Sequence, residues 1–257
     1  MSKIKNAFKS IPFVLSSYKW LLNIKERGRL GRKPTAEIFS TIHRKNAWKG
    51  EHSVSGRGSD LHQTRNIITA IPRVCRDFKI RSILDVPCGD FHWMSNVQLV
   101  GIDYTGADIV PAIIQTNAAT HQRESTRFMV KNLITDDLPV ADLIFCRDCL
   151  VHLSFNDIKC AIKNMCRSGA RYLMTTTFTD RVVNHDITTG QWRTLNLEKP
   201  PFSFPPPELL VREGCEEYGE EFSDKSLGLW TLESLRKTIY VAGHNVEPAV
   251  SDGNTSR

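Results

Sequence analysis

Short strand-like segments alternate with helical patterns along the chain from residue 81 onward. The segments "SILDV", "DYTGAD", "RFMVK", "DLIFC" and "RYLMTTT" predict strands at 82–86, 103–108, 127–131, 142–146 and 171–177. Helices are predicted between them, at 91–98, 111–122 and 155–167. Short, largely apolar strands that alternate with helices are typical of a mostly parallel sheet covered on both faces. We therefore predict an α/β fold.

The pattern changes on both sides of this region. Upstream, 35–50 and 61–78 have helical patterns, the second despite Pro72, and the Ser- and Gly-rich stretch 51–60 between them is typical of a loop. Downstream, the prolines before residue 208 can border a strand but not occupy its centre. We expect a final antiparallel hairpin with strands at 208–214 and 226–231, followed by a frayed C-terminal tail.

Basic residues are concentrated at the N-terminus. Residues 1–33 hold nine Lys and Arg and a single acid, Glu26, for a net charge of +8, whereas the remaining residues hold 25 basic and 27 acidic side chains, for −2. The total of +6 therefore belongs to the first segment and not to the body of the protein. A slightly acidic body argues against nucleic acid as the substrate.

The basic segment 1–34 contains one apolar run, "IPFVLSSYKWLL", which Ser16, Ser17 and Lys19 interrupt. The run is too short for a membrane span and no small-residue cleavage site follows it, so we expect neither a transmembrane segment nor a secretory signal. An amphipathic basic helix there would contact an anionic membrane surface or a partner protein. A helix packed on the domain, or a loosely ordered arm, is the alternative.

The chain has seven cysteines, an odd number, and several lie within predicted strands and helices. This distribution indicates reduced thiols in a cytoplasmic protein and not a disulfide framework. Cys146 and Cys149 form a lone CxxC with no second Cys or His pair at ligand spacing, so buried thiols are preferred over a zinc or redox site. We expect no bound metal.

Polar residues follow the predicted strands, where open α/β sheets bind their ligands. "DVPCGD" follows the first strand, and its Gly89 lets backbone N–H groups approach a ligand with no Cβ in the way. Asp108 ends the second strand, where a carboxylate can bind both hydroxyls of a ribose. Asn132 and Leu133 follow the third strand, and "CRDCLVHLS" follows the fourth. These positions predict a nucleoside-binding site at one edge of the sheet.

This combination resembles the class I S-adenosylmethionine-dependent methyltransferases over about residues 80–232. The resemblance implies a Rossmann-like sheet of seven strands, mostly parallel with an antiparallel last strand, with helices on both faces and an N-terminal helical extension. It also implies S-adenosyl-L-methionine as the cofactor, with the ribose on Asp108, the adenine between residues 132 and 133, and the amino-acid end on the loop after the first strand. The implied cofactor-binding residues are Asp85, Pro87, Cys88, Gly89, Asp108, Ile109, Asn132, Leu133, Cys146 and Arg147.

Three positions depart from the pattern of that family. Where the family has acid-x-Gly-x-Gly-x-Gly, this chain has "DVPCGDF" at 85–91, so only the central glycine remains. An amide, Asn132, replaces the acid that usually binds the adenine. Asp148 and His152 stand in place of an amide-Pro-Pro-aromatic motif, which disfavours methylation of DNA or of protein amides.

The wider set of motifs narrows the resemblance. "SVSGRGSDLHQTRNI", "DVPCGDFHWM", "LIFCRDCLVHLS", "TTGQWRTLNLEKPPFSFP" and "DKSLGLW" together resemble bacterial methyltransferases associated with cell-surface polysaccharide synthesis. The resemblance implies that the acceptor is a sugar hydroxyl, or a phosphorylated or nucleotide-activated precursor of a surface (capsular) polysaccharide.

Asp148 and His152 are spaced i, i+4, so a helical segment would place them on one face. A His held by a carboxylate is a suitable general base for a hydroxyl, so we predict His152 as the catalytic base and Asp148 as its partner. A His that caps or packs beneath the cofactor loop is one alternative, and an Asp-x-x-x-His pair that holds a divalent ion is another. The residues predicted to contact the acceptor are His92, Arg57, Arg65, Trp192 and Arg193.

The sequence divides into a basic N-terminal segment (1–34), a helical lid and cofactor-loop region (35–80), a methyltransferase domain (81–242) and a flexible tail (243–257). Two other functions remain open at this point. One is methylation of a nitrogen or of a phosphate oxygen on another small molecule. The other is a catalytically silent subunit that binds the cofactor and acts through a partner.

Overall fold

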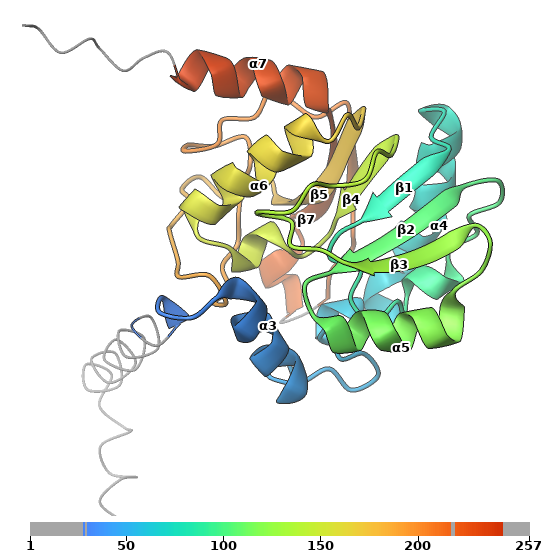
Figure 1. Ribbon diagram of the computed structural model, residues 1–257. Helices are drawn as coiled ribbons and strands as arrows, with labels where there is room; N and C mark the ends of the chain where they lie inside the picture. The colour runs from blue at the N-terminus through green and yellow to red at the C-terminus, as the bar shows by residue number, and fades with distance from the viewer. Residues whose placement is uncertain (1–27, 29, 217–218, 244–257) are drawn as a thin grey trace, which may run out of the picture.

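The computed structural model describes residues 28, 30–216 and 219–243 (Figure 1). The expectations for most of the basic segment 1–34, and for all but the first residue of the tail 243–257, fall outside these residues. Within the described ranges, none of the helices combines the length and the hydropathy needed to cross a bilayer.

A single mixed sheet of seven strands forms the centre of the molecule. Its order is β3-β2-β1-β4-β5-β7-β6. The first five strands of the chain run parallel, β7 runs antiparallel to β5, and β6 runs antiparallel to β7. The predicted α/β fold, the five parallel strands and the final hairpin are therefore confirmed. The strands are β1 (Ser82–Asp85), β2 (Asp103–Asp108), β3 (Thr126–Val130), β4 (Leu143–Cys146), β5 (Tyr172–Phe178), β6 (Leu209–Arg212) and β7 (Lys225–Thr231).

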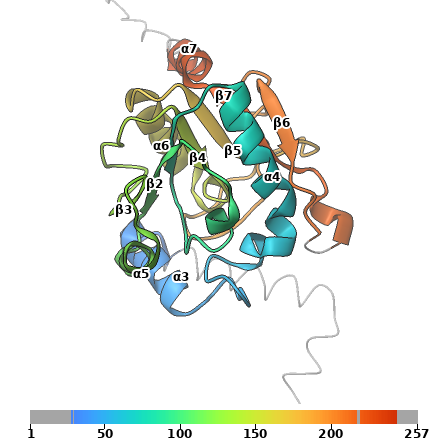
Figure 2. The ribbon, with the colours of Figure 1, turned by 90° about the vertical axis from the view of Figure 1, so that its right-hand side faces the viewer.

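Successive side chains of the central strands enter two separate hydrophobic cores. In β1, Ile83 packs into the core beneath α4 (Leu61–Asp77), whereas Leu84 packs into the core beneath α6 (Phe155–Arg167) and α7 (Leu232–Gly243). Because both faces are covered, the inner strands have to be apolar almost throughout, which is why they appear as short apolar runs in the sequence. Figure 2 shows α4 on the opposite side of the sheet from α6.

The order of the strands creates a crevice at one end of the sheet. The chain proceeds outward from β1 through β2 to β3, then returns to β4 on the other side of β1. Ligands of open α/β sheets bind where the strand order reverses, beyond the carboxyl ends of the strands. Helices α3 (Thr35–Arg44) and α5 (Pro111–His121) lie next to each other at this end in both ribbon views (Figures 1 and 2).

Two predicted helices are wrong in extent. The prediction at 91–98 corresponds to one turn of 3₁₀-helix at Met94–Asn96. Phe91 instead takes a left-handed conformation, with φ of +59°, and its ring packs 5.1 Å from Tyr104 and 5.2 Å from Phe128. Tertiary packing of this aromatic cluster has overridden the local helical pattern.

The helix predicted at 35–50 ends at Arg44. Asn46 and Lys49 have φ of +42° and +54°, so the chain turns twice directly after the helix. The turns direct the segment 46–60 across the end of the sheet. Helix α4, in contrast, extends through Pro72 as predicted, because its buried face of Ile67, Ile71 and Val74 packs on the sheet.

Candidate functional site

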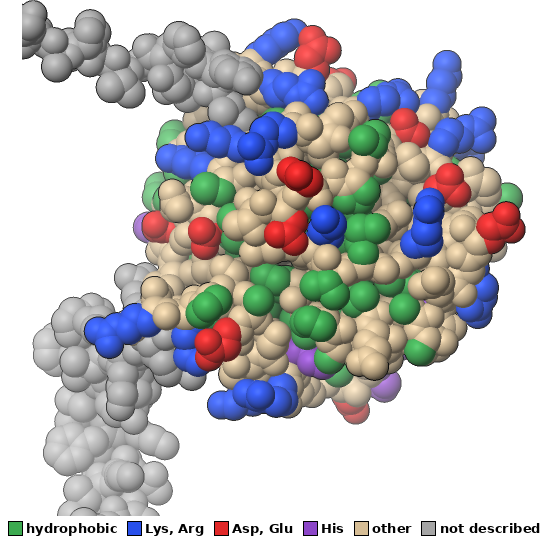
Figure 3. All heavy atoms as spheres, in the orientation of Figure 1, with side chains coloured by type: hydrophobic (Ala, Val, Ile, Leu, Met, Phe, Trp, Pro, Cys, Tyr) green, Lys and Arg blue, Asp and Glu red, His purple; other side chains and the backbone are tan. Residues whose placement is uncertain are grey.

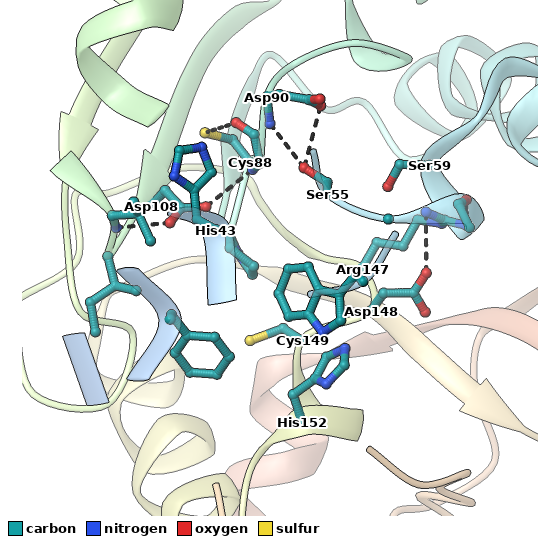
Figure 4. A pocket seen from close by; sticks show the side chains of 18 of the residues that line it. His43, Ser55, Ser59, Cys88, Asp90, Asp108, Arg147, Asp148, Cys149 and His152 are labelled. Atoms are coloured by element: carbon teal, nitrogen blue, oxygen red, sulfur yellow. Dashed lines mark hydrogen bonds and ion pairs between the residues drawn. The ribbon is translucent and has the colours of Figure 1, made fainter. Parts of the chain in front are cut away.

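A cavity of about 780 Å³ opens at the carboxyl ends of the strands (Figure 4). One half, here the β1–β3 half, is lined by residues 85–90, 108–110 and 131–134. The other, the β4–β7 half, is lined by residues 147–149, 152–153 and 221–222, with Phe178, Trp192 and Lys225. Residues from α3 and from the segment 47–59, here called the covering segment, cover both halves. Within the region 35–80, the residues that line the cavity lie between 35 and 59, whereas α4 packs on the sheet.

The loop after β1 is fixed to its neighbours through its backbone. The Cys88 N–H donates to Ala107 O at 2.8 Å, and the Asn117 amide donates to Gly89 O at 2.7 Å. Gly89 has φ of +54°, and a Cβ there would lie 2.2 Å from Ser55 Oγ. The loop therefore requires glycine for its conformation and for the close approach of the covering segment.

Asp108 ends β2 beside this loop. Its Oδ2 accepts a hydrogen bond from the Gly89 N–H at 3.2 Å, and its Oδ1 accepts one from the Val110 N–H at 2.9 Å. Burial raises the pKa of Asp108 to about 6, against the lowering effect of these backbone donors. A carboxylate has about four lone-pair sites, so Asp108 can still accept a hydrogen bond from a ligand in the cavity.

Asp85 lies deeper, at the end of β1, with 3% of its surface exposed. Its Oδ2 accepts a 2.6 Å hydrogen bond from the Tyr104 hydroxyl. Burial raises the pKa of Asp85 to about 8, and the nearby Asp108 carboxylate raises it further, while the Tyr104 bond opposes the shift. At neutral pH this carboxyl group is therefore largely protonated in the ligand-free protein.

The turn after β3 is held by side-chain bonds to its own backbone. Asn132 Oδ1 accepts from the Ile134 N–H at 2.9 Å, and the Asn132 N–H donates to Asp136 Oδ2 at 2.9 Å. Asn164 of α6 donates to Leu133 O at 2.9 Å. The edge of the cavity at Asn132 and Leu133 is thus rigid, and the Nδ2 group of Asn132 is one donor near this turn, beside the Lys131 side chain that also lines the cavity.

Four charged residues form a buried ion-pair cluster at the start of the β4–β7 half. Arg147 Nη2 lies 2.6 Å from Glu213 Oε2, and Arg147 Nη1 lies 3.2 Å from Asp148 Oδ2. Lys225 Nζ lies 2.7 Å from Asp148 Oδ2 and 3.5 Å from Glu213 Oε2. Burial would raise the pKa of Asp148, but Arg147 and Lys225 outweigh it and hold that pKa well below its usual range. Asp148 is therefore a permanent anion.

His152 ends a turn of 3₁₀-helix at Leu150–His152, and its ring borders the same half of the cavity. His152 Nδ1 lies 3.0 Å from the carbonyl oxygen of Gln191, and the ring stacks with Trp48 at a centroid distance of 4.9 Å. Burial lowers the pKa of His152 to about 4. The ring is therefore neutral at physiological pH.

Asp148 and His152 do not share a helical face. Asp148 precedes the 3₁₀ turn and has φ of +51°, so the helical spacing that would pair the two side chains does not apply. The partners of the Asp148 carboxylate are Arg147 and Lys225, and the hydrogen bond of the His152 ring goes to Gln191 O. Asp148 affects His152 only through its charge, which raises the pKa of the imidazole.

Hydrogen bonds attach the covering segment to the loop after β1 and to the end of β4. The Val54 N–H donates to Asp90 Oδ2 at 2.8 Å, and the Asp90 N–H donates to Ser55 Oγ at 3.0 Å. Arg147 Nη2 donates to Gly58 O at 2.8 Å. Figure 4 shows Ser55 and Asp90 on the far side of the cavity from His152, so the segment spans its whole width.

The predicted cofactor residues gather at the cavity. All ten except Cys146 line it; Cys146 lies fully buried in β4. His43, for which the sequence predicts no role, reaches the cavity from α3 and lies beside Cys88 and Asp108 in Figure 4.

The predicted acceptor residues are dispersed. Arg57 and Trp192 line the cavity, whereas His92 and Arg65 lie outside its lining, and Arg65 pairs with Glu216 at 2.6 Å. Arg193 is buried behind the wall, where its guanidinium donates to the carbonyl oxygens of Leu150, Leu153 and His185. Arg193 therefore secures the 3₁₀ turn that carries His152, and this position excludes direct contact with a ligand in the cavity.

Several lining residues gave no signal in the sequence. Lys225 begins β7 one residue before the predicted strand 226–231, and Phe178 and Phe222 are hydrophobic residues of the kind found in cores. Trp48 stood within a predicted helix. Among the described residues, His, Cys, Asp and Glu side chains do not gather in groups of three that could hold a metal ion.

Comparison with models of protein families gives no match, and comparison with curated proteins gives none either. Solved structures with a similar course of the chain include the methyltransferase domain of a bacterial Hen1, CtHen1-CN (14% identity, 67% of this chain and 100% of that chain, TM-score 0.48). Another is human N-acetylserotonin methyltransferase in complex with SAM (18% identity, covering 69% of this chain and 58% of that chain, TM-score 0.46). A third is PigF with SAH (13% identity, covering 65% of this chain and 54% of that chain, TM-score 0.49). At these identities the likeness concerns the fold alone.

Proposed function

We propose that this protein is a class I S-adenosylmethionine-dependent methyltransferase that transfers a methyl group to an oxygen acceptor. The observation that carries the proposal is the position of Asp108, a carboxylate at the end of β2 that borders the cavity beside the Gly89 loop. The sequence resemblance at the loop after β1, at Asp108 and at residues 132–133 supports the same function.

The β1–β3 half has the groups that the methyl donor requires. Asp108 would accept hydrogen bonds from both ribose hydroxyls, and the turn at Asn132 and Leu133 would border the adenine. The loop around Gly89 would hold the methionyl end, and an ammonium group bound there would favour the ionised form of the Asp85 carboxyl group. The sulfonium makes the methyl carbon electrophilic, so the protein has to align donor and acceptor and to remove a proton.

The β4–β7 half is the side on which we place the acceptor. His152 is neutral at physiological pH and borders the cavity, as a general base for a hydroxyl group must. Trp192 is 47% exposed and its ring packs edge-on against the buried rings of Phe178 and Phe222. A rigid aromatic side chain exposed in a cavity is a suitable platform for a ring of the acceptor.

For the acceptor we propose a sugar hydroxyl or a phosphorylated precursor of a surface polysaccharide. The support is the resemblance of five sequence motifs to bacterial methyltransferases of that process, together with the exposed Arg57 at the cavity. On the face shown in Figure 3, acidic side chains stand among the Lys and Arg side chains, with hydrophobic ones between them. This mixed surface favours a small-molecule acceptor over nucleic acid. None of the seven cysteines, all of which lie in the described residues, forms a disulfide bond, which agrees with the cytoplasmic location that we propose.

The test begins with the donor site. Titration calorimetry with S-adenosylhomocysteine should show binding to the wild-type protein, weakened at least about tenfold in Asp108→Asn, because a neutral amide loses charge-assisted bonds to the ribose. Glu124→Gln, an exposed acid remote from the cavity, is the control. Methyl transfer is then assayed with labelled S-adenosylmethionine and candidate sugars. Absence of binding by the wild-type protein would refute the proposal.

A further inference from the structure

The His152 ring is held on two sides by groups that are not acidic. A carbonyl oxygen only accepts hydrogen bonds, so the contact between His152 Nδ1 and Gln191 O assigns the proton of the neutral ring to Nδ1. Nε2 then carries the free lone pair, as a base requires. The second contact is with Trp48, whose ring plane is inclined by 34° to that of His152.

Trp48 is fixed independently of His152. The two left-handed residues Asn46 and Lys49 flank it, and the Ala47 N–H donates to Ile42 O at 3.0 Å, which ties the turn to α3. The Phe39 ring lies 6.4 Å from the indole. Gly56 approaches so closely that a Cβ there would lie 3.1 Å from Trp48 Cβ. The indole therefore has little freedom to leave the histidine.

The attachment of the covering segment fixes the position of Trp48 relative to the cavity. Its bonds to Asp90 anchor it to the loop after β1, and its bond from Arg147 anchors it to the end of β4. Trp48 belongs to the same segment, so the segment that covers the β1–β3 half also contacts His152 in the other half.

We propose that Trp48 is a positioning residue that, with the carbonyl group of Gln191, holds the His152 ring with Nε2 available as the base. This inference rests on the proposed function for its catalytic meaning. It assigns to Trp48 and to a backbone carbonyl the task for which the sequence pointed to Asp148. The covering segment that is anchored to Asp90 and Arg147 therefore also holds the His152 ring in position.

A purely structural role for Trp48 gives a different expectation. If the indole only fills space, its removal lowers the stability of the protein but leaves the His152 ring in one tautomer. If it positions the ring, its removal exposes the imidazole to water and frees it to rotate. The charged groups that act on His152, namely Asp148, Arg193 and Lys225, are present in both cases.

The experiment is nitrogen NMR of protein labelled at histidine, with the His152 resonances assigned by their loss in His152→Gln. Wild-type His152 should show the Nδ1–H tautomer and stay neutral down to about pH 5. The test variant is Trp48→Leu, which keeps more apolar volume than Trp48→Ala and is therefore more certain to fold. In this variant both nitrogen resonances of His152 should move toward the average of the two tautomers. The titration midpoint should rise toward the ordinary value of 6.5. Trp48→Phe should restore the wild-type spectrum.

Glu51→Ala, an exposed change in the same segment, is the matched control and should leave the spectrum unchanged. Unaltered His152 resonances in Trp48→Leu would overturn the proposal, as would an Nε2–H tautomer in the wild-type protein. Calorimetry with S-adenosylhomocysteine separates this outcome from the proposed function. If the His152 resonances are unchanged in Trp48→Leu while the wild-type protein binds S-adenosylhomocysteine, only the role of Trp48 is refuted. If the resonances move but the wild-type protein does not bind S-adenosylhomocysteine, only the proposed methyltransferase function is refuted.

Discussion

Tyr104 and Asp85 connect the hydrophobic core to the cavity. The Tyr104 ring packs in the core beneath α4, while its hydroxyl donates a 2.6 Å hydrogen bond to the carboxyl group at the end of β1. Both residues are almost fully buried, so the bond is shielded from water. The conformation of a carboxyl group in the site is therefore set by packing on the far face of the sheet.

Replacement of Tyr104 by Phe tests this connection. The variant keeps the ring and leaves a buried carboxyl oxygen without its donor, which costs about 1–3 kcal/mol of unfolding free energy. Urea denaturation at pH 7 would measure the loss. Tyr172→Phe, which removes a partly exposed hydroxyl of the same sheet, is the control and should cost less than about 0.5 kcal/mol. Equal effects of the two changes would contradict the finding.

The ligand-free protein should lose stability between pH 6.5 and 8. Burial raises the pKa of Asp85 from 3.8 to about 8, so the folded protein keeps a proton that the unfolded chain releases. The raised pKa of Asp108, about 6, acts mainly below this window, and the lowered pKa of His152, about 4 against 6.5, opposes part of the fall near pH 6.5. The unfolding free energy should therefore fall by at most about 1.4 kcal/mol per pH unit from pH 6.5 to 8.

Asp85→Asn removes the titrating group while it keeps an oxygen for the Tyr104 hydroxyl. Its unfolding free energy should be nearly constant over the same window, as measured by urea denaturation at several pH values. A slope as steep as that of the wild-type protein would show that another group is responsible.

Gly89→Ala should weaken the binding of S-adenosylhomocysteine about tenfold. The new Cβ would lie 2.2 Å from Ser55 Oγ, and the residue would have to keep φ of +54°, a strain of about 1–3 kcal/mol. Gly89→Ala/Ser55→Gly removes the clash and should recover part of the affinity. Gly101→Ala has a similar positive φ of +69° and open space around it, so calorimetry should find its affinity unchanged.

Glu213→Gln should destabilise the protein by about 3 kcal/mol. The change leaves Arg147 and Lys225 buried with only Asp148 to balance two positive charges. Glu216→Gln, which weakens a solvent-exposed pair with Arg65, should cost less than about 1 kcal/mol in the same thermal or urea denaturation. Similar costs at the two positions would mean that the buried cluster adds no stability through its charge balance.

The sequence was sufficient where a property depends on neighbouring residues. Strand positions follow from apolar runs that both cores require, and Asp108 lies at the cavity because parallel strands end at the same edge. The 3.6-residue period correctly placed α4 and α6, even through Pro72.

The parts that were missed depend on contacts between distant segments. The sequence places Arg193 at the acceptor because it is polar and adjoins Trp192, but its guanidinium group donates to the carbonyl oxygens of the distant Leu150 and Leu153 and of the nearby His185. Helical spacing pairs Asp148 with His152, but Asp148 itself takes a left-handed conformation and its carboxylate contacts Arg147 and Lys225. The pattern of neighbouring residues predicts neither the contacts of Arg193 nor those of Asp148.

The two halves of the cavity come from different parts of the chain. Apart from the covering segment, residues 85–134 supply the whole β1–β3 half, and residues from 147 onward supply the β4–β7 half. Substitutions in the second stretch can therefore reshape the β4–β7 half without altering the residues that supply the β1–β3 half. Under the proposed function, chimeras that exchange only the second stretch between relatives should change the methyl acceptor and retain the affinity for S-adenosylhomocysteine.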